Sequence, residues 1–280
     1  TQSRSSAASD VYKRQDVSNL ARVFTGYDYD TSKNQPTNLS GSTVTGLQQA
    51  LLPMAFNAAR HSTLAATFLG TTVAAGTSGP AALKAALDTL FNHPNVGPFI
   101  GRQLIQRLVT SNPSPAYVGR VAAAFADNGS GTRGDLRAVI ATVLLDPEAR
   151  GAAGLASPQY GRLREPMVRF VQWGRTFGLR SARGTWKIDN LSDPATRLGQ
   201  SPLRSGSVFN FFRPGYVPPS TPLATTGQVA PEFQIVTETS VSGYLNFMQN
   251  VIRFGYYVNA PDLPQGSSSA ANGFDITCSY

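Results

Sequence analysis

The sequence is short of the residues that build most metal and redox sites. Its 280 residues include one cysteine, Cys278, and two histidines. A single cysteine cannot form an internal disulfide, and so few histidines exclude most zinc sites, which use cysteine and histidine ligands. No apolar stretch approaches the ~20 residues that a membrane-spanning helix needs. We therefore expect no metal site, no cofactor and no membrane span.

Charged residues are also scarce, and most of them are arginines. Only 14% of the residues are charged, against about a quarter in a typical domain. The net charge is +8, but no run of five or six like charges forms a basic tail. The sequence also lacks a phosphate-binding loop and a dinucleotide fingerprint. Nucleic acid is therefore not the partner that we expect.

The first fifteen residues differ in character from the rest. The stretch "SSAASDVYKRQ" is polar and aperiodic, and it resembles the in-frame translation of sequencing-adapter DNA at the ends of metagenomic reads. We therefore interpret residues 1–15 as a non-native segment and leave them out of the fold prediction. Residues 16–280 are expected to form a single helical domain, a fragment truncated at both ends.

Apolar residues recur every three or four positions over much of the chain, which predicts helices. The strongest patterns predict helices near residues 80–91, 94–108, 117–125, 136–145, 164–177 and 231–254, with a weaker one at 17–24 behind Asp16 as a cap. Residues 178–229 show no sustained period, and residues 60–79 fit either a short strand pair or irregular chain. Short connections favour antiparallel neighbours. We expect a mainly α fold: a compact, irregular multi-helix bundle with long Pro/Gly/aromatic loops and little strand.

The stretch "LFNHPNVGPFIGRQLIQRLVT" resembles the start of a helix more than a reactive site. Proline suits the first turn of a helix, so Pro94 predicts a cap at His93 or the residue before it. Gly97 and Gly101 lie on the apolar side, where they predict close approach of a neighbouring backbone. Arg107 also falls on that side, and a buried arginine needs a carboxylate or several carbonyl partners. These five residues are expected to be structural.

The candidate catalytic residues are His61 and Asp28. Hydroxyl residues follow His61, so a nucleophile activated by the imidazole is conceivable, although the nucleophile elbow of serine hydrolases is absent. A structural His61 is the alternative. Asp28 also begins a stretch, "DYDTSKN", that resembles a calcium loop but lacks its glycine and its final glutamate. A turn rich in aspartate explains that stretch better.

The loop "RSGSVFNFFRPGYVPP" is the most aromatic segment of the chain. Its rings have neither helical nor strand spacing, so they must pack against the helices or bind something. If the loop binds, a carbohydrate-like or peptide ligand suits rings that are bordered by polar and basic side chains. The candidate ligand-binding residues are Arg204, Asn210, Arg213 and Tyr216.

Six arginines between residues 162 and 183 stand against a single acid, Glu165. On a helix, Arg162 and Arg169 border one side of the apolar stripe, and Arg164 and Arg175 border the other. Such arginines usually cover apolar surface with their stems and keep their charges in water. The alternative is a surface that binds an anion, either a polymer or a partner protein.

Several long blocks of the sequence resemble a known protein family. They include "LFNHPNVGPFIGRQLIQRLVTSNPSPAYVGRVAAAF", "LREPMVRFVQWGRTFG", "RLGQSPLRSGSVFNFFRPGYVPP" and "APEFQIVTETSVSGYLNFMQN". These blocks, from about Asp16 to Asn250, resemble a bacterial family known as domain of unknown function number eighteen hundred. The resemblance implies export to the periplasm or the exterior, and it implies no catalytic residue because the activity of the family is not established. Where the family tends to show His-Asp and a lysine, this chain has His61 followed by Ser62.

Together these observations favour a non-catalytic binding or assembly module that is exported, with an anionic polymer or a co-exported protein as candidate partner. The alternative is an extracytoplasmic hydrolase that acts on a polymer with residues around His61 and Asp28. A deep pocket that holds both residues and a hydroxyl favours the hydrolase. A His61 remote from acids and hydroxyls favours the binding module.

Overall fold

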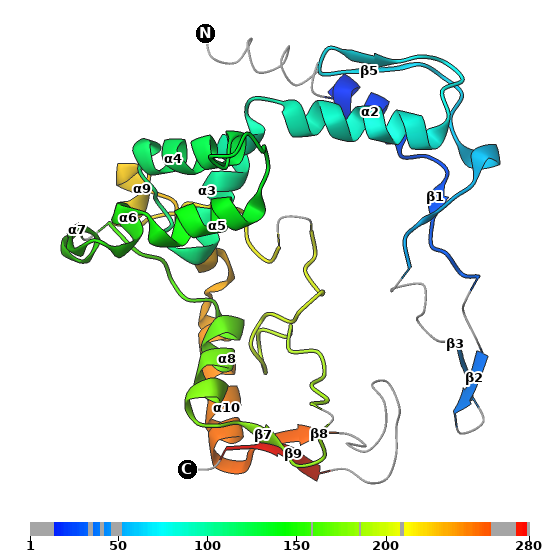
Figure 1. Cartoon of the computed structure of the whole chain (residues 1–280). Helices are drawn as coiled ribbons and strands as arrows, with labels where there is room; N and C mark the ends of the chain where they lie inside the picture. The colour runs from blue at the N-terminus through cyan, green and yellow to red at the C-terminus, as the bar shows by residue number, and fades with distance from the viewer. Residues whose placement is uncertain are drawn as a thin grey trace. The chain divides into compact units, whose positions relative to one another are not determined.

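The computed structural model of the chain describes residues 14–32, 36–39, 42–45, 52–157, 159–184, 186–207, 210–258 and 273–278. Helices predominate, and the strands are short (Figure 1). The chain forms two compact units, residues 1–96 and 97–280.

The first unit combines a few short strands with two helices. Residues 14–23 are helical. The elements that follow are β1 (Tyr27–Asp28), β2 (Pro36–Leu39), β3 (Ser42–Thr45), β4 (Ala55–Phe56), η2 (Ala58–Arg60), β5 (Ala66–Phe68), β6 (Thr71–Val73) and α2 (Gly79–Asn92). β1 pairs with β4, β2 with β3 and β5 with β6, all antiparallel. The ambiguous stretch is therefore partly a strand pair, with a turn at Leu69 and Gly70 where both φ angles are positive.

The core of the first unit lies between the β5–β6 hairpin and the two helices. Phe68 and Ala86 are fully buried, and Val23 is almost so. The side chain of Asn19 donates a hydrogen bond of 2.6 Å to the carbonyl of Thr67, which ties the first helix to the hairpin. The sequence predicted Asp16 as the cap of that helix. This prediction was wrong, because the helix already includes residues 14 and 15. Its carboxylate instead accepts the backbone N–H of Leu69.

The second unit contains most of the helices. In chain order its elements are α3 (Val96–Leu108), α4 (Pro115–Ala126), α5 (Leu136–Leu145), α6 (Pro147–Arg150), α7 (Ala152–Ala156), α8 (Pro166–Thr176), β7 (Arg180–Ser181), α9 (Pro222–Thr226), η3 (Pro231–Ile235), α10 (Glu238–Phe254), β8 (Tyr256–Val258) and β9 (Gly273–Thr277). β9 pairs with both β7 and β8 in an antiparallel sheet. None of the helices in the described ranges combines the length and the apolarity needed to cross a bilayer.

Helix boundaries differ from the sequence prediction at two places. His93 ends α2 as its C-terminal cap, and α3 begins at Val96 rather than at Pro94. Nδ1 of His93 accepts the N–H of Asn95, a local contact in the segment that follows α2. The helix predicted from residue 231 is interrupted, because Thr237 and Ser240 form a capping box that starts α10 anew at Glu238.

The two glycines of α3 let α4 approach closely. A Cβ atom on Gly97 would lie 3.3 Å from the carbonyl oxygen of Ala122, and one on Gly101 would lie 2.9 Å from Cγ1 of Val121. Val121 is fully buried, so its side chain has little space into which it can move. The sequence expectation of a close neighbour thus corresponds to α4.

Replacing Gly101 with alanine is expected to lower the free energy of unfolding by roughly 1–3 kcal/mol, because the new methyl group overpacks the contact with Val121. Gly119 of α4 provides the matched control, since a Cβ there meets no atom within 4 Å. Alanine at position 119 should stabilise the protein by roughly 0.5–1 kcal/mol. Urea unfolding measures both variants, and an equal effect of the two substitutions would contradict this account of the helix contact.

α4 and α5 are held together by polar contacts, one buried and one partly exposed, as well as by packing. The hydroxyl of Tyr117 donates to the carbonyl oxygen of Val143. Arg120 donates two hydrogen bonds, of 2.7 and 2.8 Å, to Asp146 at the end of α5. These bonds and the backbone N–H of Glu148 hold the pKa of Asp146 below its usual range.

A hydrophobic core of this unit lies between α8, α10 and the small sheet, and α8 runs beside α10 (Figure 1). Phe170 of α8 contacts Phe247 of α10, with ring centroids 5.8 Å apart. Gly243 of α10 faces the backbone of Pro194 and Ala195, so the irregular chain lies directly on the helix. The long segment without periodicity is therefore part of the packed structure.

Candidate functional site

His61 is bound to the end of the first helix rather than to an acid. Its Nδ1 lies 2.9 Å from the carbonyl oxygen of Thr25 and 3.3 Å from the hydroxyl oxygen of the same residue. The carbonyl can only accept, so this contact favours a proton on Nδ1. The Thr25 hydroxyl donates to the carbonyl of Arg22 and accepts the N–H of Ser62, which occupies it structurally.

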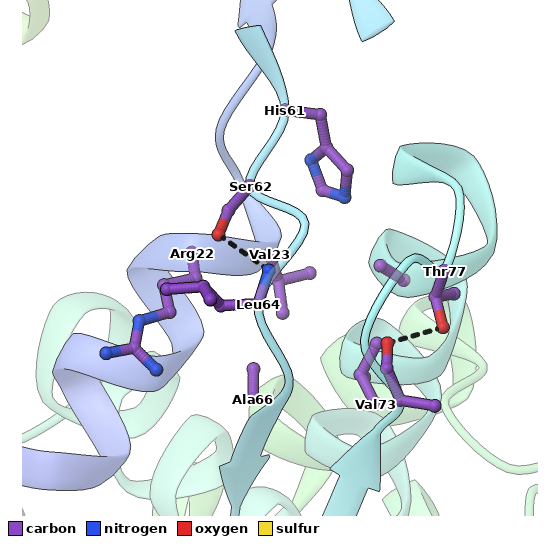
Figure 2. Close-up of a pocket in the computed structure, with 10 residues that line it drawn as sticks. Arg22, Val23, His61, Ser62, Leu64, Ala66, Val73 and Thr77 are labelled. Atoms are coloured by element: carbon purple, nitrogen blue, oxygen red, sulfur yellow. Dashed lines mark hydrogen bonds between the residues drawn. The ribbon is translucent and has the colours of Figure 1, made fainter.

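The pocket beside His61 is too small for a substrate. Figure 2 shows it between the imidazole, Ser62, Val23 and Val73, and it has room for about one water molecule. Ser62 uses its hydroxyl locally, as an acceptor for the N–H of Leu64. A hydrolase needs space for the substrate next to its nucleophile and base, and this pocket does not provide it.

Asp28, the other candidate catalytic residue, pairs with Arg60 instead of His61. The carboxylate lies 3.4 Å from the Arg60 guanidinium, and both side chains are exposed. In the described part of the chain, Asp28 and His61 share no hydrogen bond. Asp30 accepts the N–H of Ser32, as in an aspartate turn, and the described residues contain no group of three metal-ligating side chains. The pair expected for the hydrolase is therefore not assembled here.

A buried cluster of charges lies in the second unit, where the sequence suggested a solvated rim of arginines. Arg162 contacts Glu232 at 3.2 Å and Glu165 at 3.9 Å, and Arg107 contacts Glu165 at 3.7 Å. The side chain of Arg162 is only 16% exposed and that of Glu232 only 1%. The expectation of a water-exposed Arg162 was wrong, because η3 brings a second carboxylate that its sequence position does not reveal.

Arg107 connects this cluster with the aromatic loop. Its guanidinium lies over the ring of Phe212 at 4.3 Å from the centroid, a cation–π contact. The neighbouring Gln106 is buried and donates from its side chain to the carbonyls of Ser111 and Pro214. Phe212 itself is buried, so this part of the aromatic loop packs against α3.

An open pocket of about 140 Å³ is lined in part by Glu165. Its polar lining is Glu165, Gln200, Ser201, Ser205 and Asn210, and its apolar lining is Met167, Pro202, Leu203 and Phe211. Gln200 joins the pocket to the charge cluster, because its amide donates to Glu165 at 2.8 Å and its carbonyl accepts the N–H of Met167. This pocket is the candidate functional site.

Two residues of the pocket wall have strained backbones. Leu203 and Asn210 have φ angles of 59° and 69°, which residues other than glycine seldom adopt. Leu203 is also completely exposed. Such conformations concentrate at binding sites, where the surrounding structure maintains them. Leu69, Trp186 and Ser220 share this conformation outside the pocket, so the backbone angles describe the shape of the wall and do not by themselves indicate a function.

The predicted ligand-binding residues do not converge on one site. Asn210 lines the pocket, whereas Arg204 and Arg213 are exposed and Tyr216 is half-buried outside it. The backbone N–H of Arg213 donates to the side chain of Gln234 at 2.7 Å. Gln200 and Glu232 are buried polar residues that were not predicted from the sequence. Glu232 had one weak sequence signal, since acids are few in this chain, and Gln200 had none.

Comparison with models of protein families gives a match that covers most of the chain. Residues 5–272 match the model of the family described as Protein of unknown function (DUF1800). This chain belongs to that family. No curated protein and no solved structure matches it. The match confirms the resemblance drawn from the sequence blocks and extends it on both sides of residues 16–250.

Proposed function

We propose that this member of the DUF1800 family is a non-catalytic binding module that holds its ligand in the pocket beside Glu165. The supporting observation is the set of polar side chains that line that pocket. Ser201 is buried, and in the described part of the chain neither its hydroxyl nor the side-chain amide of Asn210 has a hydrogen-bond partner. Neither group is among the buried polar atoms that lack a partner, so both are open to solvent, and a ligand that enters the pocket can replace water at them.

The charge cluster behind the pocket supports a binding role over a catalytic one. Glu165 has both oxygens engaged, with Arg107 and Arg162 on one side and Gln200 on the other. A carboxylate that is held in this way orients the pocket wall but is poorly placed to take or give a proton in a reaction. The expected module is exported, and its helices assemble as a compact irregular bundle.

The proposal is tested by a binding screen with the whole chain. We expect saturable binding, with one site per chain, to one class among neutral oligosaccharides, acidic polysaccharides and a peptide library. Mass spectrometry of the ligand after incubation should show it unchanged. Cleavage of a bound polymer that disappears in a His61→Ala variant would instead favour the hydrolase, and absence of binding in all three classes would refute the proposal.

The proposed export has its own measurement. The full-length gene, expressed in a bacterial host, should place the protein in the periplasmic or extracellular fraction. Retention with a cytoplasmic marker would contradict this part of the proposal and leave the binding role untouched.

A further inference from the structure

The pocket beside Glu165 also carries information about the kind of ligand. Resting on the proposed binding function, we infer that the pocket takes a neutral sugar residue of a glycan. Phe211 packs against the C–H face of the ring, and Asn210 and Ser201 bind its hydroxyl groups. Three properties of the lining lead to this assignment.

The first property is charge. The pocket is lined by one charged side chain, Glu165, and no basic side chain is among its lining residues. Behind the wall, Arg107 and Arg162 balance Glu165 and Glu232 one for one. An anionic ligand would be repelled by the carboxylate of Glu165. A cationic ligand would compete with the guanidinium groups of Arg107 and Arg162 for that carboxylate. A neutral ligand avoids both the repulsion and the competition.

The second property is the type of free polar group. The amide of Asn210 and the hydroxyl of Ser201 each donate and accept hydrogen bonds. Sugar hydroxyls do the same, so either group can pair with them without leaving a lone donor or acceptor. The carbonyl of Gln200 is already engaged with the N–H of Met167, which leaves Asn210 and Ser201 as the groups available to a ligand.

The third property is the backbone around the pocket. Its lining residues belong to the start of α8 and to irregular chain, and none belongs to a strand. One mode of peptide binding adds the peptide as a strand to an exposed sheet edge, and this lining offers no such edge. Phe211, Met167 and Pro202 provide a compact apolar surface instead, which suits a ring with an apolar face.

Asn210 offers a clean test, because its φ of 69° is one that glycine adopts readily. The Asn210→Gly substitution removes the amide and keeps the backbone. Ser220 has a φ of 58°, is exposed and does not line the pocket, so Ser220→Gly is the matched control. Both variants should melt at or above the temperature of the unmodified chain, which establishes that they fold.

The experiment is an array of neutral oligosaccharides, followed by calorimetric titration of the tightest binder into the whole chain. We expect roughly tenfold weaker binding for Asn210→Gly, because the amide makes paired hydrogen bonds, and less than twofold change for Ser220→Gly. Phe211→Ala should weaken binding as well.

Three outcomes would overturn the inference: no neutral oligosaccharide binds, the two glycine variants bind equally well, or a sulfated or uronic-acid oligosaccharide or a peptide binds more tightly. In the last case the binding module remains and only the sugar assignment falls. If nothing binds in any class, the proposed function falls with it.

Discussion

Replacing Arg162 with methionine is expected to lower the free energy of unfolding by about 3–5 kcal/mol. The substitution leaves the carboxylate of Glu232 in the interior without its cation, at a side chain that is only 1% exposed. One oxygen of Glu232 already lacks a hydrogen-bond partner among the described residues, so no neighbouring donor replaces Arg162 when it is removed. Urea unfolding followed by near-ultraviolet circular dichroism measures the change.

A double substitution separates the missing charge partner from lost packing. Arg162→Met combined with Glu232→Leu replaces the buried pair with apolar side chains, and such exchanges are often neutral or stabilising. We expect the double variant to recover most of the stability lost by the single one. A single variant that loses less than about 1 kcal/mol, the range of a surface ion pair, would show that the cluster is hydrated in solution.

Replacing Gly243 with alanine is expected to cost about 3 kcal/mol, at the upper end for overpacking a core contact. The new Cβ would lie 2.6 Å from the carbonyl oxygen of Ala195 and still closer to that of Pro194. Both atoms belong to the backbone, so relief requires that the whole segment move away from α10. Thermal unfolding should show the loss as a lower midpoint temperature.

Ser242 is the control for this prediction, because it precedes Gly243 on the same helix and is exposed. Ser242→Ala should leave the midpoint unchanged or raise it slightly, since alanine is the better helix former. If the two alanine variants behave alike, the segment around Pro194 does not lie on α10 in solution.

Most of the helices could be predicted from the sequence. Leucine, isoleucine and valine at every third or fourth position indicated α2, α3, α4, α5 and α8, because one stripe of each helix must be buried. Boundaries were less predictable, since they depend on single contacts. His93 is the C-terminal cap of α2, its N–H bonded to the carbonyl of Leu90, and Thr237 divides the last helical segment by capping.

The candidate site was much less predictable. Arg107 could be expected to have an acidic partner, because a charge on the apolar side of a helix needs one. The partner is Glu165, 58 residues later in the sequence, and no periodicity connects the two. Glu232 and Gln200 were missed for the same reason, and His61 and Asp28 attracted attention because histidine and paired aspartates are chemically conspicuous in a sequence.

By itself, then, the sequence determined the helical class and the family, and its single cysteine excluded an internal disulfide. These follow from composition, from local periodicity and from long continuous blocks of residues. Only the tertiary structure decided which charges are buried together and where a ligand has room. A pocket and an ion cluster join residues that are distant in the chain, and their energy depends on burial and distance, which exist only once the chain has folded.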